Sequence, residues 1–344
     1  MLRQVAMAGL RVGLTAAAYY GGAQIGLQLA LVHGQVTPLW PPTGIALVCL
    51  LFWGLRCWPG ITLGAFLVNI AIWPSPLPVA MICIGNTLAP VCAWLLLRWA
   101  RFRVDLARMQ DALALVFLGA FAGMAVSATN GAAVLAVFGA LPADQIWPTW
   151  SVWWAGDAMG VLIVAPFVLA VRAAWPLRAV QPRRLAEAAA LAVIALGLAV
   201  LATNAPAQQR LLFLVFPAVV WAAVRFRLVG ATSCALAIST LAALAAAQRT
   251  GPFAGLDMPS AMIILHAFNA SVALTGLLLA VVTVERDQAR LEIERACVDL
   301  ADTLAKVRPG YLLEGLHLTA VRRAQAHAKD STPPPNPPEP RQDV

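Results

Sequence analysis

The chain has 344 residues, of which 61% are hydrophobic and only 12% are charged, and its formal net charge is +8. Ordinary soluble domains hold roughly 45–50% apolar and about 25% charged residues, so no soluble fold could bury this much apolar surface. The positive charge does not indicate nucleic-acid binding, because the arginines fall in short turns between apolar runs and form no basic face interleaved with aromatic side chains.

Apolar runs follow one another along the chain, separated by charges and by clusters of proline and glycine. Unlike the alternating strands of a β-barrel they are long and uniform, and helices satisfy their own backbone in lipid. The prediction is an all-α, polytopic integral membrane helical bundle of about ten transmembrane helices. The expected spans lie near 8–31, 38–53, 58–73, 78–98, 112–139, 149–171, 186–203, 211–224, 228–247 and 258–284. The first run could instead be a cleaved signal peptide, which the further runs disfavour, and the short second or eighth could be re-entrant.

The arginines sort to one side of these spans, which matches the excess of Lys and Arg in cytoplasmic loops. With the amino terminus inside, the outside loops hold only Arg210 and Arg249. The inside segments hold Arg3, Arg11, Arg56, Arg98, Arg101, Arg103, Arg108, Arg172, Arg178, Arg183, Arg184, Arg225 and Arg227. The prediction is a multi-pass protein with both termini in the cytoplasm.

After Val284 the composition changes from apolar to charged. The expected domains are 1–284 in the membrane, 285–308 as a cytoplasmic signalling helix, 309–330 as a short amphipathic segment and 331–344 as a disordered Pro-rich tail. The cytoplasmic helix has the four-three spacing of a coiled-coil seam at Ile293, Cys297, Leu300, Leu304 and Val307. The seam is short. Two interpretations stay open: pairing through 285–307, with a second copy or a cytoplasmic signalling protein, and a solvated helix that pairs with nothing.

The second span opens with Trp40, Pro41 and Pro42, and Gly44 follows one residue later. Paired prolines cannot continue a helix, so the chain should enter this span as an extended or broken segment, with Trp40 at headgroup depth. One interpretation is a helix start with an aromatic anchor. The other is a re-entrant element that lines an outward cavity, where free carbonyls could meet a ligand.

The sixth span contains Trp153 and Trp154, followed by Gly156, Asp157 and Gly160. Asp157 is expected to be the only carboxylate well inside an apolar run. An acid in the bilayer costs about 2.5–3.5 kcal/mol on insertion scales, so it should face protein or water, and it is the first functional candidate. A structural role, pairing with an arginine or capping a broken helix, is the alternative. The two glycines, one turn apart, would let a neighbouring helix approach closely.

Other polar groups inside the apolar runs have hydrogen bonding between helices as their ordinary role. They are Asn69, Asn86, Ser127, Asn130, His266 and Asn269. His266 and Asn269 share one face of the last span, which leads toward the charged helix, so ligand sensing there could be transmitted. No metal site, cofactor or disulfide is expected, because no histidine has a partner at ligand spacing and no CxxC pair occurs. The familiar catalytic and nucleotide-binding signatures are missing too.

Several stretches, in order and spacing, resemble the type-one membrane-associated sensor domain family, called MASE. They are residues 39–46 (LWPPTGIA), 58–69 (WPGITLGAFLVN), 153–166 (WWAGDAMGVLIVAP), 216–226 (FPAVVWAAVRF) and 266–286. The resemblance implies a bacterial inner-membrane input module of the kind fused to histidine kinases, diguanylate cyclases or phosphodiesterases. The matching stretches bring Arg225 into the set of ligand or signal candidates. Family members normally continue into an output domain, and no kinase, GGDEF or EAL signature follows here, so the chain is expected to signal through a separate partner or to be a truncated relic.

The leading hypothesis is a non-enzymatic sensory module in the lipid bilayer. A stimulus read near residues 40–44 and Asp157 would shift the last span and the helix beyond it. The first rival is a small-molecule transporter or channel that binds its substrate at the buried acid. The second is a membrane scaffold that tethers a cytoplasmic partner.

Overall fold

The computed structural model describes residues 2–29, 37–73, 75–175, 181–205 and 211–307, and within these ranges it excludes the side chains of residue 2 and of residues 304–307. Every regular element in the described ranges is helical. The predicted all-α class is therefore confirmed. The expected segments 309–330 and 331–344 lie outside the described residues.

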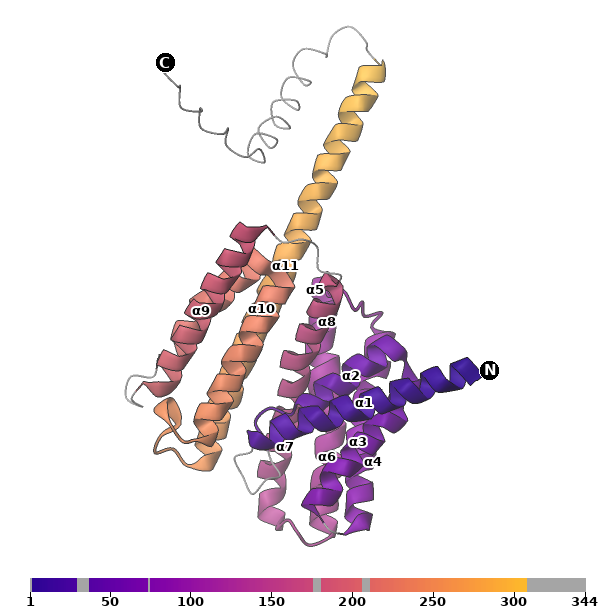
Figure 1. Ribbon diagram of the computed structural model, residues 1–344, viewed down its shortest axis with the longest axis vertical. Helices are drawn as coiled ribbons and strands as arrows, with labels where there is room; N and C mark the ends of the chain where they lie inside the picture. Colours follow the sequence, from indigo (N-terminus) through magenta and orange to yellow (C-terminus); the bar gives the residue numbers. More distant parts are fainter. Residues whose placement is uncertain (1, 30–36, 74, 176–180, 206–210, 308–344) are drawn as a thin grey trace, which may run out of the picture. The chain divides into compact units, whose positions relative to one another are not determined.

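The course of the chain can be followed in Figure 1. The helices are α1 (Leu2–Gln28), α2 (Pro41–Trp53), α3 (Trp58–Ile72), α4 (Pro76–Trp99), α5 (Met109–Ala114), α6 (Gly123–Val137), α7 (Ile146–Met159), α8 (Ala165–Ala174), α9 (Pro182–Asn204), α10 (Phe216–Ala247) and α11 (Met258–Val307). Two π-helical segments, η2 (Leu115–Ala122) and η4 (Gly160–Val164), join α5 to α6 and α7 to α8. Such wide turns often mark functional positions in helices.

Proline lies in the first turn of α2, α3, α4, α8, α9 and α10. The first helical position tolerates proline because its backbone N–H would have no partner within the helix, and the fixed φ suits a helix. In α2 both Pro41 and Pro42 are buried in this first turn, after Trp40, whose backbone is not helical (φ −109°, ψ 86°). A helix therefore begins at this motif, and the choice between an anchored helix start and a re-entrant element stays a prediction.

Seven helical segments of the described ranges are long and apolar enough to cross a membrane. They correspond to the expected spans three to seven, to the eighth and ninth taken together, and to the tenth. The 13 residues of α2 are fewer than a bilayer-spanning helix needs. The segment α1 does not qualify among the seven. The expected total of about ten stays a prediction.

The segment Leu211–Ala247 turns back on itself. Its 37 residues would measure about 55 Å as one straight helix, against a bilayer core of about 30 Å. The backbone of Arg227 interrupts the helix with φ 53° and ψ −141°. Beyond this break Gly230 lies close to the Ala222 carbonyl, and Ala231 shares a small apolar cluster with Ala223. The two arms have the bounds expected for separate spans, and the break falls in the residues predicted to join them.

The chain consists of two compact units, Met1–Glu285 and Arg286–Val344. In the first unit α1 packs on α2 and α3, α4 packs on α3 and α6, and α9 packs on α10. In the second unit the described residues are the end of α11. There Leu291, Ile293, Val298 and Leu300 all expose large apolar side chains.

Candidate ligand-binding pocket

The start of α2 and the end of α7 meet backbone to backbone. The Trp40 amide donates to the Gly156 carbonyl at 3.1 Å. The Thr43 hydroxyl lies within hydrogen-bonding distance of the Asp157 carbonyl, at 2.9 Å, and of the Trp40 carbonyl, at 2.8 Å. Two sequence motifs that are more than a hundred residues apart thus form one structural unit.

Two glycines make this close approach possible. A side chain at Gly44 would collide with the Gly160 carbonyl, and one at Gly160 would collide with the Trp40 carbonyl and the Thr43 hydroxyl. Gly156 is confined in the same way by the Thr37 carbonyl. Gly156 and Gly160 were predicted to let a neighbouring helix approach closely. The structure has such a close approach, and the neighbour is the start of α2 with the segment that leads into it.

Asp157 sits directly beside this crossing and is only 2% exposed. The Ser127 hydroxyl of α6 donates to its Oδ2 atom at 2.5 Å, and the same hydroxyl lies 3.4 Å from the Asn86 Oδ1 atom of α4. Among the described residues no arginine, lysine or histidine forms an ion pair with Asp157. Its carboxylate therefore belongs to a hydrogen-bonded polar cluster, and no described residue forms an ion pair with it.

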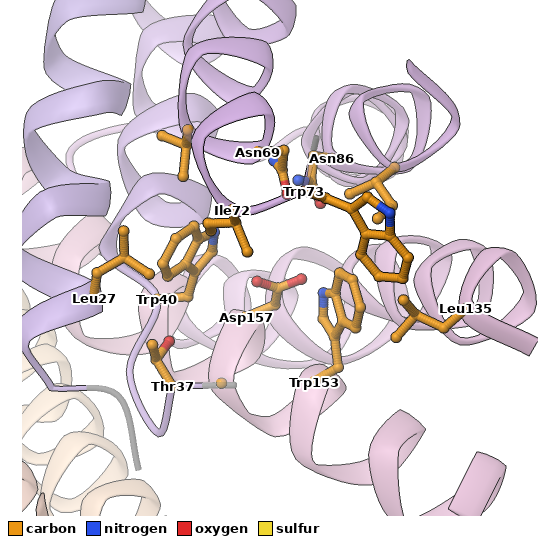
Figure 2. A pocket seen from close by; sticks show the side chains of 13 residues that line it. Leu27, Thr37, Trp40, Asn69, Ile72, Trp73, Asn86, Leu135, Trp153 and Asp157 are labelled. Atoms are coloured by element: carbon orange, nitrogen blue, oxygen red, sulfur yellow. The ribbon is translucent and has the colours of Figure 1, made fainter. Parts of the chain in front are cut away.

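A cavity of about 70 Å³ opens in front of this carboxylate. Three tryptophans and four polar side chains line it: Trp40, Trp73, Trp153, Thr37, Asn69, Asn86 and Asp157. Figure 2 shows the Asp157 carboxylate pointing into the space between the Trp40 and Trp153 rings. The walls come from the start of α2 and from α3, α4 and α7, with Leu27 of α1 and Leu135 of α6 closing the sides. A concave, mostly apolar site with a few converging polar groups is typical of small-molecule binding.

The MASE1 family model matches residues 11–287. The chain belongs to the MASE1 family. No curated protein and no solved structure matches it. MASE1 is a family of membrane sensor domains that serve as sensory input modules and not as catalytic ones, so the chain is a multi-pass membrane sensor domain. The match runs from α1 to residue 287 of α11, where the charged part of that helix begins. The family recognised from the sequence motifs is confirmed.

The MASE1 motif in α7 separates its paired tryptophans between two environments. Trp153 lines the pocket. Trp154 instead stacks on Trp150, with ring centroids 5.8 Å apart, and Trp150 stacks on Trp147 at 4.9 Å. The Trp154 indole N–H donates to the Phe121 carbonyl, at 2.8 Å, within the π-helical segment η2. Trp154 thus fastens α7 to that wide turn and contributes no surface to the pocket.

The remaining candidates of this MASE1 domain lie elsewhere. Arg225, at the turn of the α10 hairpin, pairs with Glu187 of α9 at 2.6 Å. His266 and Asn269 are on α11, and their Nε2, Nδ2 and Oδ1 atoms are buried without a hydrogen-bond partner. Asn130 donates to the Met81 carbonyl at 2.8 Å, which is the ordinary interhelical role predicted for it.

The structure also buries a second carboxylate, which the sequence interpretation did not anticipate. Asp111, near the start of α5, is 1% exposed. The Arg108 guanidinium donates to both of its oxygens, at 2.8 Å each, and this hydrogen bonding raises the pKa of Arg108. The Arg103 amide adds a third bond at 3.0 Å. Asp157 is therefore not the only buried acid, but Asp111 has a cationic partner and Asp157 has none among the described residues.

Three polar or aromatic pocket residues were missed as site candidates: Thr37, Trp73 and Asn86. Trp73 follows Asn69 by one helical turn, a spacing that places both on one face of α3, and this was the available signal. Asn86 was recognised as a polar group in an apolar run and given only a structural role. Its 7% exposure and its contact with Ser127 place it beside the acid.

Proposed function

We propose that this MASE1 chain is a non-enzymatic sensory input module of a bacterial inner membrane, in which occupancy of the pocket changes the position of α11 and the pairing of its exposed end. The observation that carries the proposal is that one short segment, residues 37–40, contributes to the pocket and also lies next to α11. Thr37 and Trp40 line the pocket. The His266 ring of α11 approaches the Pro38 backbone.

The other end of the first unit offers a second point of control. The Met109 amide at the start of α5 donates to the Glu285 carboxylate of α11 at 2.7 Å. This contact lies next to the Arg108–Asp111 pair. A ligand that moves the 37–40 segment would act on α11 near His266, which lies between the Glu285 contact and the start of the helix. A conformational response requires that the ligand bind two arrangements with different affinity, and the shared segment supplies the difference in contacts.

The output in this proposal is a parallel pairing of α11 with a second copy. Ile293 and Leu300 are 64% and 60% exposed, and Cys297 between them is exposed as well. These positions have the four-three spacing of a coiled-coil seam. An apolar stripe on an otherwise charged helix is a surface that pairing would bury. A cytoplasmic signalling protein would read the paired state.

The inside–outside assignment follows the arginines. Arg101, Arg103 and Arg108 lie in the loop whose hydrogen bonds join Asp111 at the start of α5, next to the Glu285 contact. An excess of positive charge marks the cytoplasmic side of short loops. We therefore assign this end of the bundle, and the amino terminus with it, to the cytoplasm.

Cys297 supplies the test, because in a parallel pair two copies of a seam residue face each other. The full chain, with its five other cysteines replaced by alanine or serine, is oxidised in native membranes and the disulfide-linked dimer is quantified. The matched control moves the thiol to the exposed, off-seam position 299 by combining Cys297→Ser with Asp299→Cys. Cys297 should crosslink more efficiently than the control, and adding Asp157→Asn should change its efficiency and leave the control unchanged.

Equal crosslinking at both positions would refute pairing through the seam, and a seam efficiency that ignores Asp157→Asn would refute the coupling. Transport is the rival use of the same pocket. Uptake of a solute into liposomes by the purified chain, abolished by Asp157→Asn, would establish it. Membership of a sensor family favours the input role.

A further inference from the structure

The pocket contains an uncompensated acid. A carboxylate in an apolar interior is costly unless a positive charge or several hydrogen bonds stabilise it. Asp157 has the Ser127 hydroxyl and the Trp153 indole as hydrogen-bond partners, but it has no ion-pair partner among the described residues, whereas the equally buried Asp111 has Arg108. The missing positive charge can come from a ligand, because the Asp157 carboxylate forms part of the cavity wall.

The tryptophans indicate what kind of positive charge suits the cavity. The face of an indole attracts a cation, and it does so most effectively when the cation is weakly hydrated, as alkylammonium groups are. Trp40 and Trp153 flank the carboxylate, and Trp73 lies across the cavity (Figure 2). A carboxylate between indole rings offers charge neutralisation and cation–π contact to the same group. It offers nothing comparable to an anion.

The small number of metal-coordinating side chains argues against a metal ion. No cluster of three or more histidine, cysteine, aspartate or glutamate side chains that could hold a metal occurs among the described residues. A single carboxylate balances a single positive charge. The cavity of about 70 Å³ has room for roughly five to seven water-sized groups, which is the size of a small alkylammonium ion.

We propose that the stimulus read by this pocket is a small alkylammonium ion, held by the Asp157 carboxylate and by the Trp40, Trp73 and Trp153 rings. This inference rests on the proposed sensory function and names its ligand class. An amide oxygen adds an acceptor for a hydroxyl or N–H group on the ligand. Asn69 uses its Nδ2 atom to donate to the Ala65 carbonyl, at 2.8 Å, which leaves its Oδ1 atom as an acceptor at the cavity wall. The same chemistry occurs in a free amine and in the ammonium headgroup of a lipid.

The binding experiment compares choline with its uncharged carbon isostere, 3,3-dimethyl-1-butanol. The purified full chain is reconstituted in nanodiscs of an anionic lipid without amine headgroups, and heat of binding is measured by titration calorimetry. Choline should bind saturably, and the isostere should bind at least about tenfold more weakly because it lacks the charge. Addition of phosphatidylethanolamine to the nanodiscs distinguishes the sources: competition with choline identifies a lipid headgroup, and unchanged binding identifies a free amine.

Two variants and one control locate the site. Asp157→Asn should reduce choline affinity about tenfold or more, and Trp40→Phe about threefold, because phenylalanine offers a weaker cation–π surface. Asp144→Asn removes an exposed carboxylate outside the pocket and should leave the affinity unchanged. Size-exclusion elution and far-ultraviolet circular dichroism verify that each variant is folded. The comparison of choline with its isostere needs no variant.

Equal affinity for choline and the isostere, or no binding of either, would overturn the ammonium inference. In that case a change in Cys297 crosslinking on Asp157→Asn would still support the sensory function. The opposite outcome is that choline binds and Asp157→Asn abolishes this binding, while Cys297 crosslinking changes neither with choline nor with Asp157→Asn. That outcome would support the ligand site and refute the proposed output.

Discussion

The buried polar groups around Asp157 are joined to one another, whereas those on α10 and α11 are not. Ser127 connects Asp157 to Asn86, and Thr43 connects the two crossing backbones. On α10 and α11, atoms of Ser239, His266 and Asn269 are buried without a hydrogen-bond partner; Tyr19 of α1 is the other such residue among those described. Satisfied polar networks specify one arrangement, and unsatisfied groups raise the free energy of the arrangement that holds them.

This difference assigns different mechanical roles to the two regions. The pocket region is fixed by close backbone contact and hydrogen bonds. The α11 region holds polar side chains that could gain hydrogen bonds if the helix packed in a different position. A switch needs two such packing arrangements of comparable free energy. The pocket is thus suited to recognition and α11 to response.

The largest effect is expected from a substitution that disrupts the close contact between the start of α2 and Gly160. Gly160→Ala places a methyl group against the Trp40 carbonyl and the Thr43 hydroxyl, so the crossing must open. Overpacking of this kind costs about 1–3 kcal/mol, and the thermal unfolding temperature in detergent should fall. Gly197→Ala is the matched control, since no atom lies within 4 Å of its added methyl group. A control that loses as much stability as Gly160→Ala would show that the crossing is not the cause.

The next effect concerns the hydrogen bond to the acid. Ser127→Ala removes the donor that lies 2.5 Å from the Asp157 Oδ2 atom. Interhelical hydrogen bonds in membrane proteins contribute about 0.6–1.7 kcal/mol, and a loss in this range is expected in denaturant titration. Ser271→Ala, whose hydroxyl bonds only within its own exposed helical turn, should change stability much less. If the two variants are equally stable, the Ser127 bond does not hold the pocket together.

A change of the opposite sign is expected on α11. Asn269→Leu replaces a fully buried amide whose two polar atoms lack partners, so stability should rise by about 1 kcal/mol. Asn130→Leu, which removes an amide bonded to the Met81 carbonyl, should lower it. The more stable α11 should also respond less, so Cys297 crosslinking in the Asn269→Leu background should become insensitive to Asp157→Asn. Destabilisation by both leucine substitutions would remove the distinction between the regions.

How far the sequence predicts these regions depends on how conspicuous each residue is in its run. Asp157 stands out because an acid is rare within apolar residues, and the glycines and prolines near it predict close packing and helix starts. Trp73 ends an apolar helix, where tryptophan is common, so its spacing of one turn from Asn69 is a weak signal for a pocket residue. The π-helical turn after Met159 has no sequence signature, although it helps to position the Gly160 carbonyl against Gly44. Pairing of Asp111 with Arg108 depends on a loop conformation that spacing alone does not determine.

The smallest effect tests whether α11 is fixed at its amino-terminal end. The Ser260 amide donates to the Asp257 carboxylate at 3.2 Å, which caps the first turn of α11. Hydrogen bonds from the Ser260 side chain and, to a lesser extent, from its amide lower the pKa of Asp257. A lowered pKa means that the capping stabilisation is present above the ordinary aspartate pKa of about 3.9 and is lost as the pH falls through the lower value of the folded state. Asp257→Asn keeps a capping oxygen that does not titrate. Amide hydrogen exchange of Met258, Ser260 and Ala261, compared between the two proteins at each pH, should be alike near neutrality and should become faster in the aspartate form only at acid pH. The same acid-induced acceleration in the asparagine variant would mean that α11 is anchored by its packing and not by this cap.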